Sequence, residues 1–181
     1  YPSLMVAAAD PQGDLAALSQ LALWHQRYSP YVRIDAPDGV AVDITGCAHL
    51  FGGEKAMLAE LADRLDRFGL TARLAIGPTI GAAWAQARYG ASAEVIIAHE
   101  TLCDHLAALP VSALRLEEDT VAALSRLGLK RIGDLLGKPR APLAARFGSE
   151  LILRLDQALD RQSEAFSPLS QPPSYRATCR F

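Results

Sequence analysis

The chain has 181 residues, half of which are hydrophobic, and its 18 basic side chains against 20 acidic ones give a formal net charge of −2. This length and composition suffice to bury the core of one ordinary domain or of two small ones, which excludes a disordered protein. The near balance of charges excludes a protein that is basic throughout, so any surface that binds nucleic acid must be local.

The first half of the chain alternates strands and helices. Apolar runs and hydrophobic periodicity predict, in order, a strand over 4–8, a helix over 14–28, a hairpin with strands over 31–34 and 40–44, a helix over 55–68, a strand over 70–76, a helix over 79–89 and a strand over 94–98. The order strand, helix, strand, strand, helix, strand is the ferredoxin-like pattern, in which two helices cover one face of an antiparallel sheet. We therefore predict an α+β fold.

The second half is predicted to be helical. Pro110 cannot continue a helix, so residues 109–111 are expected to form a joint between two domains. Periodicity then predicts short helices over 120–127, 128–136, 141–147 and 150–159, and the Pro-, Ser- and Gln-rich composition of 167–174 predicts a linker. The predicted domains are residues 1–98, a helical domain over 99–166, and a linker with the start of a further domain over 167–181.

The predicted hairpin tip, Ala-Pro-Asp-Gly at 36–39, holds the first candidate site residue. On residue type alone Asp38 is a turn residue, because Pro37 presets φ and aspartate side chains bond to their own backbone in turns. A metal site is the alternative, since carboxylates such as Asp35, Asp38 and Asp43 hold Mg²⁺. The spacing disfavours it: positions an odd number apart on a strand point to opposite faces, so the three carboxylates need not converge.

This stretch also carries a family resemblance. Ser-Pro-Tyr-Val at 29–32, the tetrapeptide at 36–39 and Asp-Ile-Thr-Gly at 43–46 resemble the palm of Y-family (translesion) DNA polymerases, whose tetrapeptide is Ser-Ile-Asp-Glu. The family's aspartate corresponds to Asp38 and its glutamate to Gly39. The run His-Leu-Phe-Gly-Gly-Glu at 49–54 resembles more specifically the noncatalytic ImuB subfamily, the polymerase-like subunits of bacterial damage-induced (SOS) mutagenesis complexes.

The resemblance implies a ferredoxin-like palm without its first strand and fingers, followed by an all-helical thumb with helix-hairpin-helix character. The missing parts of the family's chain would precede Tyr1 and follow Phe181, and since the sequence does not begin with methionine we expect it to be a piece of a longer protein. The lysines that hold the incoming triphosphate in the family correspond to Ile80 and Trp84. Their loss, together with that of the glutamate, predicts a scaffold without polymerase chemistry, without a bound metal and without a cofactor.

The predicted thumb differs from the family in charge. The family's Gly-x-Gly loop, which holds a DNA phosphate, corresponds here to Leu116, Glu117 and Glu118, and carboxylates repel phosphate. Residues 125–148 instead hold six basic side chains against one acidic one, a local patch typical of weak, sequence-independent contact with a nucleic-acid backbone. A merely solvated helix face is the alternative. The candidate DNA-backbone contacts are Lys130, Arg131, Lys138, Arg140 and Arg146.

The resemblance implies three protein partners, contacted mostly through regions outside this chain: a RecA-like mutasome subunit, the sliding clamp and a catalytic error-prone polymerase. Residues 20–24, Gln-Leu-Ala-Leu-Trp, are similar to a clamp-binding peptide but fall within a predicted helix, where packing is the better interpretation. Two alternatives stay open. The chain is part of an active polymerase, with the missing carboxylate supplied by Asp35 or Glu54, or it binds another protein through its sheet.

The cysteines indicate the compartment. Cys47, Cys103 and Cys179 are odd in number and lack zinc-ribbon or redox spacing, which favours a reducing, cytoplasmic environment over a disulfide scaffold. His99, Cys103 and His105 lie close in sequence, but a zinc site needs more converging ligands than this stretch offers. No secretory leader is recognisable at the start, and no apolar run approaches the length of a membrane span.

Overall fold

The computed structural model describes residues 8–169. The strand expected over 4–8 and the element expected after the linker therefore lie outside the described residues, apart from Ala8, which is in coil. By internal contacts the described chain divides into two compact units: residues 8–47 with 166–169 form the first, and Ala48–Ala165 the second.

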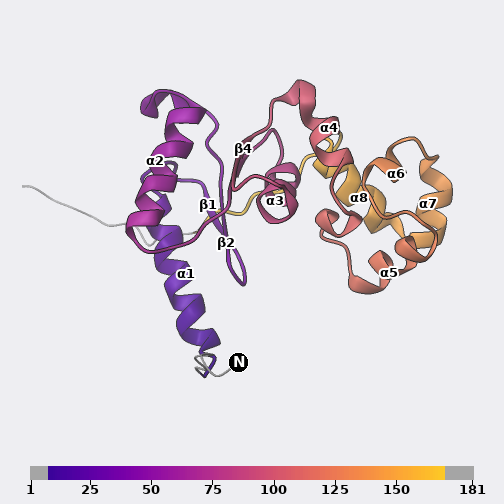
Figure 1. The fold of residues 1–181 in the computed structure, drawn as a ribbon, viewed down its shortest axis with the longest axis horizontal. Helices are drawn as coiled ribbons and strands as arrows, with labels where there is room; N and C mark the ends of the chain where they lie inside the picture. Colours follow the sequence, from indigo (N-terminus) through magenta and orange to yellow (C-terminus); the bar gives the residue numbers. More distant parts are fainter. Residues whose placement is uncertain (1–7, 170–181) are drawn as a thin grey trace, which may run out of the picture. The chain divides into compact units, whose positions relative to one another are not determined.

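The first unit is one helix against one hairpin (Figure 1): α1 (Pro11–His25), β1 (Val32–Asp35) and β2 (Gly39–Val42). Helix α1 begins where Asp10 caps it, since the Asp10 carboxylate accepts a hydrogen bond from the Gly13 N–H at 3.0 Å and Pro11 occupies the first turn. The strands pair antiparallel with Val32 opposite Val42 and Asp35 opposite Gly39. The hairpin predicted from sequence is confirmed with strand ends shifted by one or two residues.

The core of the first unit is small and partly polar. Leu18, Ala22 and His25 of α1 are buried, and so are Tyr28 and Val32. The end of the described chain returns to this unit. The Leu169 N–H donates to the Val32 carbonyl at 2.7 Å, so the tail runs beside β1.

The second unit begins with a 3₁₀ turn at Ala48–Phe51 and continues through α2 (Glu54–Arg67), β3 (Leu74–Ile76), α3 (Ile80–Tyr89) and β4 (Glu94–Ile96). Strands β3 and β4 pair parallel, with Leu74 opposite Glu94 and Ile76 opposite Ile96. This differs from the antiparallel sheet expected from sequence. The physical reason is the crossover: parallel neighbours need a long connection, and α3 supplies it.

The rest of the second unit is helical, as predicted (Figure 1). It comprises 3₁₀ turns at His99–Thr101 and Val111–Leu114 and five α-helices: α4 (Leu102–Ala107), α5 (Glu118–Arg126), α6 (Gly133–Leu136), α7 (Arg140–Phe147) and α8 (Ser149–Ala158). The α+β class predicted from sequence is confirmed.

One continuous apolar cluster holds the second unit together. It runs from Ala82 and Ala85 of α3 to Leu159 after α8 and includes the fully buried Leu106, Leu114, Leu124, Ile132, Leu135, Leu151 and Leu155. The cluster takes members from both sides of the domain boundary proposed between residues 98 and 99, and that boundary stays a prediction.

The expected joint at 109–111 is fixed by backbone hydrogen bonds. The Val111 N–H donates to the Lys130 carbonyl at 3.0 Å, and the Ile132 N–H donates to the Leu109 carbonyl at 2.9 Å. Leu109 and Val111 are also buried in the core. Pro110 does end the helical run, as its chemistry requires, but the chain around it is pinned between α4 and α6.

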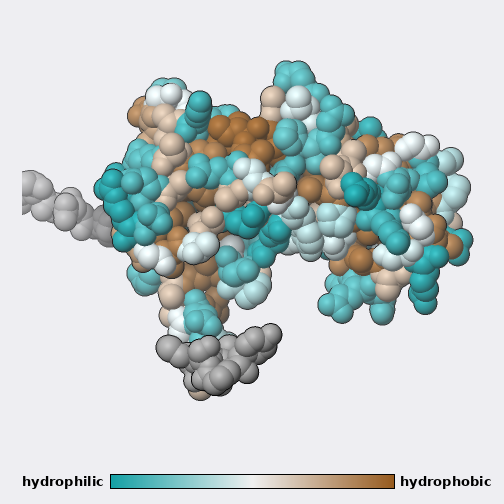
Figure 2. All heavy atoms as spheres, in the orientation of Figure 1, coloured by the Kyte–Doolittle hydropathy of each residue, from teal (hydrophilic) through white to brown (hydrophobic). Residues whose placement is uncertain are grey.

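The surface is mixed in polarity. Figure 2 shows hydrophilic and hydrophobic residues interspersed over the visible face. Among residues 8–169, no helix has both the length and the apolar composition needed to cross a bilayer.

Candidate functional site

The hairpin tip places Asp38 on the surface. Asp38 is exposed and lies in the turn between Asp35, the last residue of β1, and Gly39, the first of β2. The Ala36–Pro37 peptide bond in this turn is cis. The position fits the turn role assigned to Asp38 from residue type.

Gly39 is confined by its neighbours. A Cβ atom built on Gly39 would lie 2.9 Å from the Asp35 carbonyl oxygen and 3.0 Å from an Asp35 carboxylate oxygen. The backbone oxygen cannot move away without disturbing the end of the β1–β2 ladder, so a larger side chain at this position requires the hairpin to shift. A glutamate therefore does not fit this backbone as it stands.

The other candidate carboxylates have their own surroundings. Asp43 accepts a hydrogen bond from the Thr45 N–H at 2.9 Å and shapes the turn after β2, whereas Glu54 begins α2 in the second unit. Within residues 8–169, no group of three or more His, Cys, Asp or Glu side chains could together hold a metal ion.

Helix α3 carries Ile80 and Trp84, the positions that the sequence resemblance pairs with triphosphate-binding lysines. The Thr79 hydroxyl caps the helix by accepting from the Ala82 N–H at 3.0 Å, and it donates to the Ala158 carbonyl of α8 at 3.0 Å. Ile80, the first helical residue, is half-buried. These contacts fix the start of α3 against the C-terminal helix.

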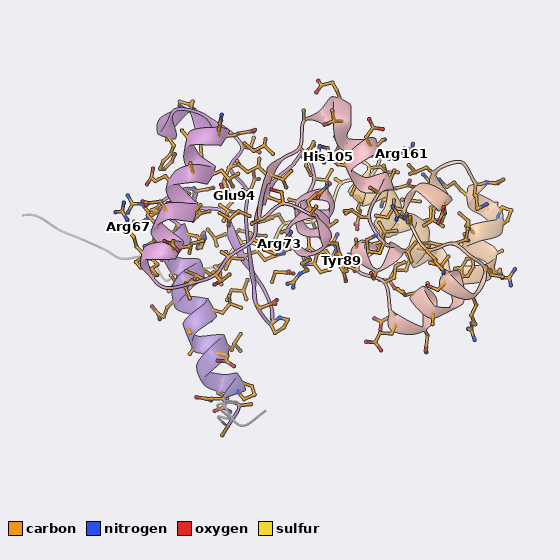
Figure 3. All side chains as sticks on the ribbon, viewed as in Figure 1. Arg67, Arg73, Tyr89, Glu94, His105 and Arg161 are labelled. Atoms are coloured by element: carbon orange, nitrogen blue, oxygen red, sulfur yellow. The ribbon has the colours of Figure 1, made fainter. Side chains whose placement is uncertain are left out.

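Trp84, one turn further along α3, lies close to two arginines. The Arg88 guanidinium lies 4.9 Å from the centroid of the Trp84 ring, the Arg115 guanidinium 5.9 Å away, and the Tyr89 ring packs at 6.0 Å. Arginine over an indole face is a favourable cation–π contact. Figure 3 labels Tyr89 at the end of α3, near Arg73, whose side chain donates to the Ala87, Gly90 and Ser92 carbonyls. Trp84 is therefore packed in place by its neighbours.

Arg115 was not singled out from the sequence. Its backbone is left-handed, with φ of 58°, and its guanidinium forms two bonds to the Glu164 carboxylate, at 2.8 and 2.5 Å. The two side chains are only 15% and 12% exposed. A basic residue between Leu114 and Leu116 was the available signal, since an arginine in an apolar run implies a buried partner.

Arg115 also accounts for a glycine in α3. A Cβ on Gly81 would lie 3.3 Å from an Arg115 guanidinium nitrogen and 3.2 Å from the Ala158 Cα. The absence of a side chain at Gly81 lets α3, α8 and Arg115 approach closely. Together, Trp84, Gly81, Arg115, Ala158 and Glu164 form what we call the α3–α8 clasp.

The segment expected from the resemblance to replace a Gly-x-Gly loop leads into α5. Leu116 packs against the core, Glu117 is the residue before the helix, and Glu118 and Asp119 occupy the first turn. Acidic side chains there stabilise the helix through its dipole. The local chemistry therefore favours a well-formed helix start and disfavours a bound phosphate.

The candidate DNA contacts fall into two groups. Lys130, Arg131, Lys138 and Arg146 are exposed. Arg140 is half-buried and paired with Asp156 of α8 at 2.9 Å, so its guanidinium already has a carboxylate partner. All five remain predicted contacts, with the four exposed cations better placed to reach a phosphate.

Asp134 organises the loop that presents two of these cations. Its carboxylate accepts from the Arg131 and Lys130 N–H groups at 2.8 and 2.9 Å, and these backbone hydrogen bonds hold the pKa of Asp134 below its ordinary value. The loop between α5 and α6 is therefore fixed by an acidic residue of α6. The Lys130 and Arg131 side chains are exposed, and the Arg131 guanidinium also donates to the Ala108 carbonyl at 3.4 Å.

The weaker motifs have structural roles. His99 pairs with Asp160 at 3.2 Å, His105 contacts the Gln86 amide at 3.1 Å, and Cys103 is exposed, so the three candidate zinc ligands have separate surroundings. The clamp-like stretch at 20–24 is helical, and its tryptophan packs against the neighbouring His25 and Tyr28 rings.

Comparison with known proteins gives two sets of relatives, although no family model matches the chain. The chain is 51% identical over 166 residues to Protein ImuB of two strains of Caulobacter vibrioides, covering 92% of this chain and 36% of the relative. Among solved structures, a Y-family DNA polymerase chimera of Dbh and Dpo4 superposes with a TM-score of 0.73 at 18% identity, over 94% of this chain and 51% of that one. DinB from Sulfolobus solfataricus superposes with a TM-score of 0.71 at 18% identity, over 92% and 50%.

The chain has the fold of about half of each of these Y-family DNA polymerase chains. By sequence, the chain is a homologue of ImuB. It spans 36% of the length of these curated relatives. The resemblance identified from the hairpin motif is confirmed.

Proposed function

We propose that the chain is part of a noncatalytic scaffold subunit of a bacterial damage-induced mutagenesis complex, which helps bring an error-prone polymerase to damaged DNA. The observation that carries this proposal is the crowding at Gly39. The family has a metal-bridging glutamate at the corresponding position, and its side chain would have no room on this backbone. Two-metal nucleotidyl transfer needs several carboxylates to hold the ions and offset the charge on the attacking and leaving oxygens. Asp38 without that glutamate is one ligand for a site that needs more.

The α3–α8 clasp supports the same conclusion. At the positions that correspond to triphosphate-binding lysines, Ile80 is half-buried and the centroid of the Trp84 ring lies 4.9 and 5.9 Å from the Arg88 and Arg115 guanidinium groups. An aliphatic and an indole group offer no point charge to a triphosphate. The helix that would hold a nucleotide is used here for internal contacts.

The architecture we propose follows the family. Residues 1–98 form a ferredoxin-like palm that lacks its first strand and the fingers, residues 99–166 a thumb with helix-hairpin-helix character, and residues 167–181 a linker leading to a further domain. The proposed partners are a RecA-like subunit, the sliding clamp and a catalytic polymerase, reached mostly through regions outside this chain. The proposal places the protein in the cytoplasm with the DNA it serves.

We also propose weak, sequence-independent DNA contact through Lys130, Arg131, Lys138 and Arg146, with Arg140 supporting the surface through Asp156. When exposed cations bind DNA phosphates, the DNA releases its condensed counterions, so affinity falls steeply as salt rises. Reversing Lys130, Arg131 and Lys138 to glutamate should abolish binding to primed DNA at low salt. Reversing Lys55 on α2, which lies outside the patch, is the matched control and should leave binding unchanged.

Primer extension tests the scaffold role. The full-length protein, with a primed template, all four nucleotides and Mg²⁺ or Mn²⁺, should add no nucleotide, and Asp38→Ala should change nothing. The second candidate, an active polymerase with a rearranged metal site, is favoured only by the retention of Asp38. Template-dependent addition that Asp38→Ala abolishes would establish that candidate and refute the scaffold.

A further inference from the structure

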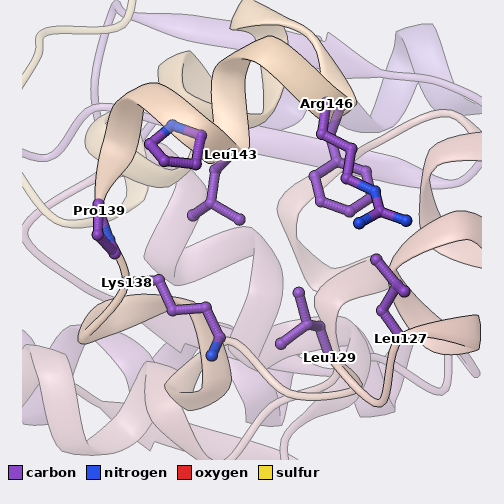
Figure 4. Close-up of a pocket in the computed structure, with 8 residues that line it drawn as sticks. Leu127, Leu129, Lys138, Pro139, Leu143 and Arg146 are labelled. Atoms are coloured by element: carbon purple, nitrogen blue, oxygen red, sulfur yellow. The ribbon is translucent and has the colours of Figure 1, made fainter.

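A pocket lies inside the basic patch of the second unit. It has a volume of about 280 Å³ and is lined by the loop after α5 and by the segment from Lys138 to Phe147 around α7. Figure 4 shows Leu127 and Leu129 on one side and Leu143 and Pro139 on the other. Six of the eight lining residues are apolar: Leu127, Leu129, Pro139, Pro142, Leu143 and Phe147.

The two remaining lining residues are cations. Lys138 and Arg146 are exposed and stand at opposite ends of the pocket in Figure 4. None of the eight lining residues is acidic. The adjoining loop presents Lys130 and Arg131 to solvent, and the carboxylate nearest to them in sequence, Asp134, is engaged by their backbone N–H groups. The pocket is thus an apolar socket with a positive rim.

The size and chemistry of the socket select its occupant. Small-molecule sites usually measure about 300–1,000 Å³ and orient their ligand with a few precisely placed polar groups. This pocket lies at the lower end of that range, and its only charged or polar side chains are the two exposed cations, Lys138 and Arg146. It suits one or two apolar side chains, the kind of anchor that carries protein–protein binding energy. A DNA backbone satisfies the cations but supplies no apolar side chain for the socket.

We propose that this pocket docks a peptide segment of a partner protein in which one or two large apolar side chains are flanked by aspartate and glutamate. The apolar anchor fills the space between Leu127, Leu129 and Leu143, and the acidic flanks meet Lys138 and Arg146. The chain's own residues 170–181 do not have this chemistry, because they carry Arg176 and Arg180 and no acidic residue. The inference goes beyond the proposed function, since a subunit with polymerase activity could carry the same pocket.

The test is fluorescence anisotropy with the whole 181-residue chain and a labelled 11-residue peptide, in which a Leu-Phe pair is flanked on each side by alternating Asp and Glu. Saturable binding is expected, and it should weaken as salt rises. A peptide with Ser-Ser in place of Leu-Phe should bind about tenfold more weakly, because it has no anchor to bury. A peptide with lysine in place of every acid should not bind.

Variants of the chain locate the contact. Leu127→Gln removes part of the apolar wall at a residue that is 45% exposed, so folding should survive, and affinity should fall about tenfold. Lys138→Glu and Arg146→Glu should each reduce affinity, and more strongly at low salt. The matched controls lie outside the pocket: Leu153→Gln on α8, at a residue 36% exposed, and Lys55→Glu on α2. Both should bind like the parent chain, and circular dichroism confirms that each variant is folded.

Four outcomes would overturn the proposal. The first is no saturable peptide binding. The second is binding that follows charge alone and is indifferent to both Ser-Ser and Leu127→Gln. The third is duplex DNA binding that Leu127→Gln weakens as much as peptide binding, which would assign the pocket to nucleic acid. The fourth is self-association of the chain that Leu127→Gln abolishes in the absence of peptide binding, which would assign it to a second copy.

Discussion

The two units bury polar groups in opposite ways. The first places a titratable residue, His25, in a small core made by one helix and one hairpin, where it is 5% exposed. The second surrounds a continuous aliphatic cluster and buries charge in ion pairs, Arg115 with Glu164 and, less deeply, Arg140 with Asp156. The second unit should therefore be vulnerable to the loss of one partner of the Arg115–Glu164 pair, whereas the first unit should lose stability in mild acid.

The two tryptophans make this comparison measurable. The chain has two tryptophans, and Trp24 lies in the first unit and Trp84 in the second. Trp84→Phe leaves Trp24 as the fluorescent probe, and Trp24→Phe leaves Trp84. Urea unfolding of these two backgrounds reports each unit separately.

The largest effect is expected from Arg115→Ala. Removing one partner of a buried pair leaves an uncompensated carboxylate, which costs about 3–5 kcal/mol of unfolding free energy. The Trp84 transition should move to much lower urea. Arg67→Ala is the matched control, because Arg67 pairs with Asp63 on the surface at 2.6 Å, and such pairs contribute about 0–1 kcal/mol. Equal destabilisation by both variants would contradict the clasp.

A smaller effect is expected from Thr79→Ala, which removes the cap of α3 and its bond to the Ala158 carbonyl. Loss of a cap typically costs about 0.5–2 kcal/mol. The Trp84 transition should shift by that amount, and Thr79→Ser, which keeps the hydroxyl, should restore most of it. A Thr79→Ser variant as unstable as Thr79→Ala would mean that the methyl group, and not the cap, stabilises the helix.

The smallest effect concerns pH and the first unit. Burial lowers the pKa of His25 below its ordinary value of 6.5. The unfolded chain therefore binds a proton that the folded unit resists, so stability falls as pH drops below about 6.5. The urea midpoint reported by Trp24 should be lower at pH 5.5 than at pH 7.5.

His25→Leu is the control for this pH effect, because a neutral side chain at that position should flatten the pH dependence of the Trp24 midpoint. Midpoints are needed rather than intensities, since the His25 ring lies 5.1 Å from the Trp24 ring and its charge alters the fluorescence directly. A midpoint that rises on acidification, or a slope that persists in His25→Leu, would remove His25 as the cause.

Sequence was a good guide wherever the signal is local. The Thr79 cap and the glycines at 69 and 90 mark helix ends through side-chain and backbone chemistry, and helices α2 and α3 begin and end within a residue or two of their predicted bounds. The parallel pairing of β3 and β4 could not be predicted in this way. Each strand has three residues, and its periodicity contains no information about the direction of its neighbour.

The features missed from sequence depend on distant partners. Arg115 and Glu164 are 49 residues apart, and Arg140 acquires its carboxylate from another helix. A count of charged residues treats Arg140 as one more surface cation, because its ion pair with Asp156 exists only after α7 and α8 pack. The pocket was missed for the same reason: Leu127 and Leu143 belong to separate predicted helices, and neither pattern indicates a space between them.

The tail contact gives the chain an unusual connectivity. Because Leu169 bonds to Val32, the whole second unit is an insertion that begins and ends within the first. When the second unit unfolds, residues 166–169 can keep their contact with β1 only by closing a loop of about 120 flexible residues. The entropic cost of that closure is modest, because it rises only with the logarithm of loop length. The first unit should therefore tolerate replacement of the insertion by a short flexible segment. Truncating the chain at the predicted boundary between residues 98 and 99 would instead divide the apolar core of the second unit.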